Sequence, residues 1–163
     1  MILPDLLREN LDIVFCGTAA GNKSAERKAY YAGPGNRFYP TLASCGFTPR
    51  VLKPHEFAEL LNYNLGLTDL VKDHCGVDKE LKDEYFDTYA FEEKILRYQP
   101  KIVCFNGKEA ARVYFDLKNT KQVFYGLQKQ TINRTKLYIA PSTSLQAVAF
   151  WDESLWMSLN KFR

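Results

Sequence analysis

The sequence predicts an α/β fold, a three-layer α/β/α sandwich built on a central, mostly parallel sheet. Three short apolar runs, at 11–16, 101–105 and 137–139, have the length and composition of strands buried on both faces. Segments with helical signals separate these runs, and strands that alternate with helices favour a parallel sheet covered on both sides. A length of 163 residues suits one core, so we expect a single domain over 1–163.

Helix signals lie between the apolar runs. Phe57, Leu60 and Leu61 share one face of a helix predicted over 54–63, because their spacing matches the helical repeat. Capping residues and charges near the ends predict further helices over 36–44, from 87 or 88 to 97, over 108–115 and over 152–161. We expect loops over 17–37 and 73–84 and a short strand over 122–126.

The loops that follow the apolar runs are the expected place of a ligand site, because parallel sheets bind ligands beyond the carboxyl ends of their strands. Three loops meet this condition: 17–37, 106–108 and 140–147. The net charge of +3 permits nucleic-acid binding without requiring it. None of the loops has the Gly-x-Gly-x-x-Gly or Walker pattern, which argues against a nucleotide-binding protein.

Composition also restricts cofactors and location. The four cysteines form no C-x-x-C pair and only two histidines are present, which argues against a zinc or iron–sulfur site. Cys16 and Cys104 fall in apolar runs, as reduced core thiols of an intracellular protein do. No apolar run approaches the roughly 18 residues of a membrane span, and the N-terminus resembles no signal peptide. We therefore expect an intracellular protein with no membrane partner, no metal and no cofactor.

Six short segments, spread from about residue 11 to residue 160, resemble the motifs of one enzyme family. They are 15–21, 31–39, 60–71, 98–108, 125–128 and 140–144. In this order they resemble the thymine-DNA glycosylase and mismatch-specific uracil-DNA glycosylase family, a branch of the uracil-DNA glycosylase superfamily. The first two are similar to the family's G-I-N-P-G motif and its G-P-G-N-x-F-W-like stretch, and the last to its M-P-S-S-S motif. The resemblance implies a glycosylase-like version of the predicted sandwich.

The resemblance implies a pocket for a flipped base and a loop that enters DNA. A base inside a duplex cannot be attacked, so such enzymes rotate it into a pocket with an aromatic face and polar groups. Tyr31 would supply the aromatic face, although a loop tyrosine can also simply pack on the core. The remaining pocket residues implied by the resemblance are Gly17, Thr18, Ala19, Ala20 and Asn106. Leu145 would be the wedge that holds base steps apart, and further DNA contacts are implied at Lys108, Ser142, Thr143, Ser144 and Gln146.

One departure from the family concerns catalysis. The family has an asparagine that positions the hydrolytic water where this chain has Ala19, which carries no polar group. Asn36 is one candidate replacement, since the asparagine of a similar N-R-F-W stretch is thought essential in a related glycosylase group; it could equally cap the following helix. Asp69 is a second candidate, because a carboxylate can activate water or stabilise a cationic sugar. Asn22 and Ser24 form a third.

The resemblance implies a monofunctional DNA glycosylase of base-excision repair, because no lysine in the pocket motifs suits Schiff-base chemistry. The expected partner is double-stranded DNA with a damaged or mismatched base, bound by a monomer in the cytoplasm, near the nucleoid, if the source is prokaryotic. The expected substrate is a deaminated base, uracil first and hypoxanthine or mismatched thymine next. Ala19 keeps two alternatives open: a slow enzyme for easily expelled bases, and a lesion- or mismatch-binding relative without catalysis.

Overall fold

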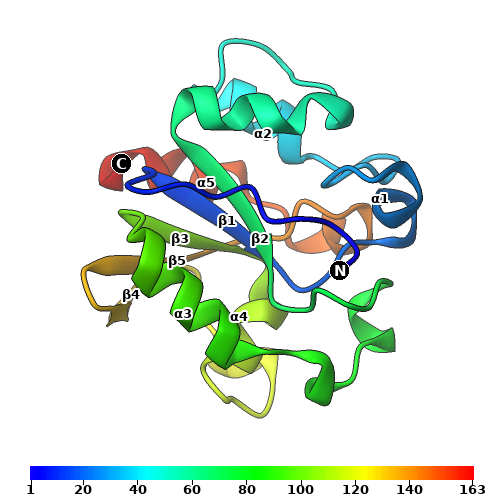
Figure 1. The fold of residues 1–163 in the computed structure, drawn as a ribbon, viewed down its shortest axis with the longest axis vertical. Helices are drawn as coiled ribbons and strands as arrows, with labels where there is room; N and C mark the ends of the chain where they lie inside the picture. The colour runs from blue at the N-terminus through cyan, green and yellow to red at the C-terminus, as the bar shows by residue number, and fades with distance from the viewer.

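A five-stranded sheet in the order β2-β1-β3-β5-β4 forms the centre of the protein (Figure 1). The computed structural model describes all residues 1–163. The strands are β1 (Ile13–Gly17), β2 (Leu65–Asp69), β3 (Ile102–Asn106), β4 (Gly126–Ile132) and β5 (Thr135–Ala140). Strands β2, β1, β3 and β5 are parallel, and only β4 runs antiparallel to its neighbour. The predicted α/β fold with a mostly parallel sheet is confirmed.

Helices cover both faces of this sheet. The α-helices are α1 (Asn22–Arg27), α2 (Phe38–Ser44), α3 (Thr88–Tyr98), α4 (Lys108–Tyr114) and α5 (Glu153–Ser158). The longer 3-10 segments are Pro54–Tyr63, Leu145–Phe150 and Leu159–Phe162. None of these helices has the length and apolar character that crossing a bilayer requires.

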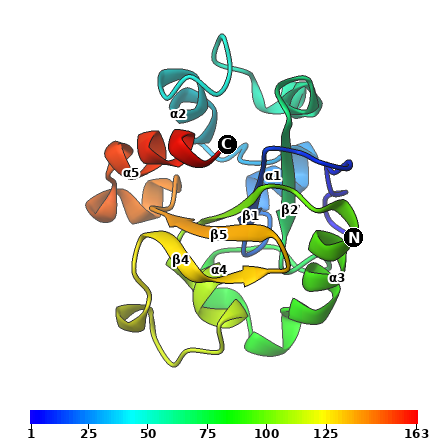
Figure 2. The same ribbon diagram turned by 90° about the vertical axis from the view of Figure 1, so that its left-hand side faces the viewer.

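Alternation along β1 shows how the core divides into two layers. Ile13 and Phe15 point to one face, where they pack with side chains of α2 and α5, including Trp156. Val14 and Cys16 point to the other face, toward α3 and α4. Figure 2 shows the sheet edge-on, with α2 and α5 on one side and α3 and α4 on the other. Because both faces are covered, the central strands are apolar throughout.

Two strands differ from the sequence-based expectation. Strand β2 was not predicted, because Gly66, Thr68 and Asp69 interrupt its apolar character, although all five of its residues are buried. The predicted strand over 122–126 is wrong: a 3-10 helix ends at Gln122, residues 123–125 have no regular structure, and β4 begins only at Gly126. Strand β4 lies at the edge of the sheet with most of its side chains exposed, so no apolar pattern marks it.

The other sheet edge is covered by the N-terminal segment of the chain. Leu6 and Leu67 of β2 exchange two backbone hydrogen bonds, each 2.9 Å long, in an isolated antiparallel bridge.

The segment 17–37, which was predicted to be a loop, contains one short helix, α1. All four cysteines are unpaired, and Cys16 and Cys104 are buried in the core.

Candidate active site

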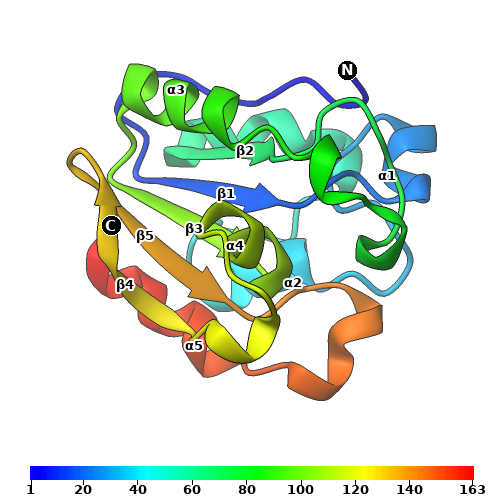
Figure 3. The same cartoon turned by 90° about the horizontal axis from the view of Figure 1, so that it is seen from below.

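The carboxyl ends of the parallel strands lie together at one edge of the sheet (Figure 3). Gly17 at the end of β1 is paired with Asp69 at the end of β2, and Asn106 at the end of β3 is paired with Ala140 at the end of β5. The loops 17–37, 106–108 and 140–147, which were predicted to form a ligand site, therefore follow neighbouring strands, as expected for a parallel sheet.

Gly17 leaves room for two polar groups above the end of β1. A methyl group added at Gly17 would lie 2.8 Å from Asp69 Oδ1 and 3.5 Å from the Tyr31 hydroxyl oxygen. The Asp69 residue is only 5% exposed, so its carboxylate is almost completely removed from water. The absence of a side chain at Gly17 is what allows a carboxylate and a phenol to meet at this point.

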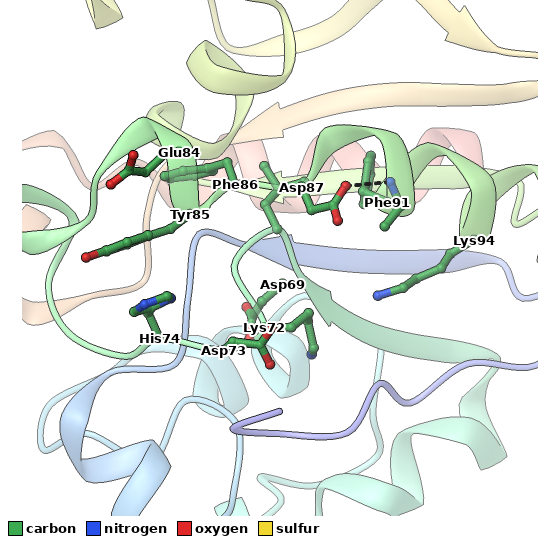
Figure 4. Close-up of a pocket in the computed structure, with 12 residues that line it drawn as sticks. Asp69, Lys72, Asp73, His74, Glu84, Tyr85, Phe86, Asp87, Phe91 and Lys94 are labelled. Carbon is green, nitrogen blue, oxygen red and sulfur yellow. Dashed lines mark hydrogen bonds between the residues drawn. The ribbon is translucent and has the colours of Figure 1, made fainter.

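Burial has a clear electrostatic effect on Asp69. Loss of hydration raises its pKa from 3.8 to about 6, while Lys72 acts in the opposite direction and Asp5 adds to the increase. A carboxylic acid with a pKa near neutrality, placed in a loop-lined site, is a candidate for proton transfer or for stabilising positive charge. Asp69 also lines a cavity of about 330 Å³, together with Lys72 and Lys94 (Figure 4).

A partly buried ion cluster lies close to Asp69 and was not predicted from the sequence. Asp5 accepts from Lys72 at 2.8 Å, from Lys94 at 2.7 Å and from the Thr68 hydroxyl at 2.7 Å. These contacts keep the pKa of Asp5 below its ordinary value in spite of burial. Thr68 and Lys72 flank Asp69 in the sequence, but Asp5 and Lys94 come from distant segments, so no local pattern reveals the cluster.

Tyr31 is held in an unusual conformation. Its φ is +54°, in the left-handed region that tyrosine seldom adopts. Its ring stacks on Phe38 with centroids 4.0 Å apart, and its buried hydroxyl has no hydrogen-bond partner. Burial and then the charge of Asp69 raise the pKa of this hydroxyl, while the nearby Asn106 amide acts in the opposite direction. Phe38 thus occupies one face of the Tyr31 ring.

The segment after β1 is bound along its length by the segment after β2. The carbonyl oxygens of Gly17, Thr18 and Ala20 accept from backbone N–H groups of residues 70, 71 and 76, at 3.0, 2.7 and 3.0 Å. The N–H groups of Thr18 and Ala19 donate to no acceptor in the protein. The carbonyl groups are thus used for folding, and two amide donors remain at the site. The Thr18 hydroxyl donates to Asp78 at 2.6 Å, a carboxylate that the sequence analysis did not select.

Asn106 joins the base-pocket segment to the loop after β5. Its Oδ1 accepts from the Thr143 backbone N–H at 3.0 Å, and its Nδ2 donates to the Thr143 hydroxyl at 3.0 Å. The Thr143 carbonyl accepts from the Arg37 N–H at 2.9 Å. Thr143 is only 1% exposed, so in this conformation its side chain supports the loop from within and does not face DNA.

Thr143→Val is expected to lower the free energy of unfolding by about 1–3 kcal/mol, because it leaves the half-buried Asn106 Nδ2 without its acceptor. Valine keeps the shape of threonine, so the change isolates the hydrogen bond. Chemical denaturation would measure the effect. Ser142→Ala is the matched control, since the Ser142 hydroxyl only accepts from Ser144 N–H at 3.2 Å within its own loop. Equal denaturation midpoints for Thr143→Val and Ser142→Ala would contradict a stabilising role for the hydrogen bond between Asn106 and Thr143.

The loop after β5 presents Leu145 to the outside. Leu145 is 54% exposed, and its side chain lies over Gly35, where an added methyl group would be 3.1 Å from Leu145 Cδ2. Ser144 caps the 3-10 helix Leu145–Phe150 by accepting from the Gln146 N–H at 3.3 Å. Lys108, at the start of α4, lies over the Tyr125 ring at 4.5 Å.

The water-positioning candidates occupy different environments. Asn36 Oδ1 accepts from the Phe38 N–H at 3.0 Å, at the start of α2, and the side chain makes no other hydrogen bond. Ser24 is 5% exposed and accepts from the Ala32 N–H at 2.9 Å, so it serves the fold of its own loop. Asn22 accepts from the Cys75 thiol at 3.5 Å. The structure shows no hydrogen bond between Asn36 and the Asp69 site.

This arrangement is that of an α/β protein whose loops at the carboxyl edge of a parallel sheet enclose a buried carboxylate, an aromatic ring and free amide donors. The sequence matches the Uracil DNA glycosylase superfamily over residues 4–159, and the chain belongs to that superfamily. Members of this superfamily are typically DNA glycosylases, which points to DNA as the partner.

A solved structure supports the fold. A proposed uracil DNA glycosylase from Methanosarcina acetivorans, determined by solution NMR, superimposes with a TM-score of 0.65 at 22% sequence identity. The match covers 96% of this chain and 92% of the other. At this identity the likeness concerns the fold. No group of three or more His, Cys, Asp or Glu side chains is arranged to hold a metal ion.

Proposed function

We propose that this protein is a monofunctional DNA glycosylase that removes a deaminated base from duplex DNA, with uracil as the first substrate and hypoxanthine or mismatched thymine next. The choice of substrates is supported by motifs that resemble those of the thymine-DNA and mismatch-specific uracil-DNA glycosylase branch. One observation carries the proposal: the Asp69 carboxylate and the Tyr31 hydroxyl meet at Gly17, Asn106 lies beside that hydroxyl, and two unused backbone donors follow Gly17. Such a site matches the needs of a flipped base and of a reaction that develops charge.

The proposed reaction begins with a base rotated against Tyr31. The C1′–N bond breaks and its electron pair remains on the base, which becomes anionic while the sugar becomes cationic. The N–H groups of Thr18 and Ala19 stabilise the anion, and the Asp69 carboxylate, mostly ionised above pH 6, stabilises the cation. Water then bonds to C1′ and loses a proton to Asp69 or solvent, and the base takes up a proton from solvent.

Asn36 is the proposed water-positioning residue. Its Oδ1 is used by the Phe38 N–H, but its Nδ2 has no partner and is available to a water molecule. Its two neighbours contact the loop after β5, residues 140–147, which we call the wedge loop. Gly35 contacts Leu145, and the Arg37 N–H donates to the Thr143 carbonyl. Asn36 would therefore lie close to the DNA when Leu145 enters the duplex.

The proposal of a monofunctional enzyme is supported by the environment of Lys72. This lysine is the nearest in sequence to Asp69, but its Nζ is bound by Asp5 at 2.8 Å and donates to the Tyr30 hydroxyl at 3.2 Å. An amine held by an ion pair and a hydrogen bond is a poor nucleophile, because Schiff-base formation needs a free lone pair on the nitrogen.

Leu145→Ala is expected to reduce base release from duplex DNA by about 10-fold and to leave release from single-stranded DNA nearly unchanged. A wedge contributes only where a base must leave a stack, and that step costs a few kcal/mol. Single-turnover rates on the two DNA forms would measure the effect. Met157→Ala is a suitable control, because Met157 is also an exposed apolar residue but lies in α5. An equal loss on both DNA forms would refute the wedge assignment.

The function itself is tested by alkaline cleavage of labelled oligonucleotides. They carry uracil, thymine, hypoxanthine or xanthine opposite each normal base, and each is also tested as a single strand. Strand breaks with the wild-type protein would establish a glycosylase and identify its base. No breaks at enzyme excess, with duplex binding intact, would overturn the enzyme proposal. The result would then favour the second candidate, a lesion-binding protein without catalysis, for which Ala19 is the supporting observation.

A further inference from the structure

The segment 116–129, which we call the Phe124 lobe, lies at the same sheet edge as the candidate site. Gly126, the first residue of β4, is paired with Ile139, one residue before the end of β5. Phe124 and Tyr125 therefore extend beyond the edge from which the wedge loop also departs. Figure 3 shows the yellow segment before β4 and the orange segment after β5 leaving that edge.

Unpaired lysines give the Phe124 lobe a positive charge. Lys118, Lys121 and Lys129 are exposed, and none of them forms a salt bridge. Asp116 is the only acidic residue of the segment. Exposed lysines without partners suit the phosphates of a nucleic acid, where their charge replaces condensed counterions.

Phe124 is the most exposed phenylalanine of the protein, at 73%. It borders a shallow cleft of about 410 Å³, lined also by Tyr125 and Leu127. A large aromatic side chain left outside the core, with lysines on both sides in the sequence, is a composition typical of nucleic-acid contacts, since rings meet sugars and bases while amines meet phosphates.

The Phe124 lobe is continuous with the site. Gly107 lies against Ser142 of the wedge loop, since a methyl group added to this glycine would be 3.1 Å from Ser142 Cβ. Lys108 follows directly and lies over the Tyr125 ring at 4.5 Å. A DNA duplex that reaches the wedge loop would thus meet Lys108 and then the lobe along one surface.

We propose that the Phe124 lobe is a second DNA contact, which holds the duplex to one side of the lesion through Lys118 and Lys121 on phosphates and Phe124 against sugars and base edges. This inference rests on the proposed function only in taking DNA as the ligand. It assigns a binding surface outside the base pocket and the wedge loop.

The test compares two double variants that remove the same charge from opposite ends of the sheet. Lys118→Gln/Lys121→Gln alters the lobe. Arg97→Gln/Arg134→Gln alters the end of α3 and the β4–β5 turn, at the far edge, where both side chains are exposed. Affinity for an undamaged duplex is measured by fluorescence anisotropy at several salt concentrations. The slope of log K against log salt should fall by about two in the lobe variant, roughly 0.9 per phosphate contact, and remain unchanged in the control.

Phe124→Ala should weaken duplex binding by about 5-fold or more, as loss of an aromatic contact with DNA does. Duplexes shortened in steps on one side of a central mismatch provide the second measurement. When the DNA on one side of the mismatch becomes too short to reach the lobe, the lobe variants and the wild-type protein should bind with equal affinity. Shortening the other side should leave their difference in affinity unchanged. Salt slopes equal to those of the control, or a length effect symmetrical about the mismatch, would overturn the inference.

The two proposals fail separately. Weaker binding by the lobe variants together with no base release by the wild-type protein would retain the second DNA contact and remove the glycosylase. Base release by the wild-type protein together with unchanged binding by the lobe variants would retain the glycosylase and remove the contact. Thermal unfolding of each variant is the control for folding, and we expect melting temperatures close to that of the wild-type protein because the substituted side chains are exposed.

Discussion

Asn36→Ala is expected to reduce the rate of base release by about 100-fold or more, the usual contribution of a group that positions or activates water. The structure offers no polar side chain at Ala19 to do this, whereas the Nδ2 of Asn36 is free of other partners. Single-turnover release of uracil from a duplex is the measurement, because it isolates chemistry from product release.

Asn36→Ser separates catalysis from helix capping. The asparagine accepts from the Phe38 N–H at the start of α2, and serine can also cap a helix but has no amide to reach a water molecule. We expect Asn36→Ala to lose about 0.5–2 kcal/mol of stability and Asn36→Ser much less, while both lose activity equally. Normal activity in Asn36→Ser would show that capping is the whole role of this residue.

Asp69→Asn should have opposite effects on activity and stability. The buried carboxylate has a pKa of about 6 in the folded protein against 3.8 ordinarily, so folding takes up a proton between these values. The contribution from protonated Asp69 is fully present below pH 3.8 and is lost as the pH rises through 6. Above pH 6 the ionised group costs up to about 3 kcal/mol, since one pKa unit corresponds to about 1.4 kcal/mol.

Replacement by asparagine removes that cost. The variant should melt up to about 6–12 °C above the wild-type protein at pH 8 and close to it at pH 4, given about 2–4 °C per kcal/mol for a chain of this size. Base release should fall by about 100-fold or more at pH 8, because the amide cannot stabilise a cationic sugar. Scanning calorimetry at both pH values supplies the test. If the difference in melting temperature between Asp69→Asn and the wild-type protein were the same at pH 4 and pH 8, Asp69 would have an ordinary pKa.

The strands show where sequence patterns succeed. The runs that became β1, β3 and β5 were recognisable because helices cover both of their faces, so nearly every side chain is apolar. Strand β2 is equally buried but contains Gly66, which leaves room for Leu11 and the backbone of Leu6. That requirement comes from residues distant in sequence, so no local pattern could reveal it.

The candidate site was also predictable only in part. That the residues after β1 and β3 would meet was predictable from the rule for parallel sheets. The motif resemblance selected Tyr31 and Asn106, and the chemistry of a carboxylate selected Asp69. Their interactions were not predictable. The burial of Thr143 depends on Asn106, and the ion cluster close to Asp69 depends on Asp5 from the N-terminal segment. Both are long-range contacts that only the folded chain brings together.

The bridge between Leu6 and Leu67 affects how copies of the protein meet in solution. An uncovered edge strand can recruit a strand from another molecule and begin aggregation. The N-terminal segment occupies this position along β2, so a foreign strand would have to displace it. The opposite edge is open, but there the exposed Lys129 of β4 would have to approach a like charge in a second copy. Both edges therefore resist strand exchange, and loss of residues 1–6 would make β2 the first place for the folded protein to self-associate.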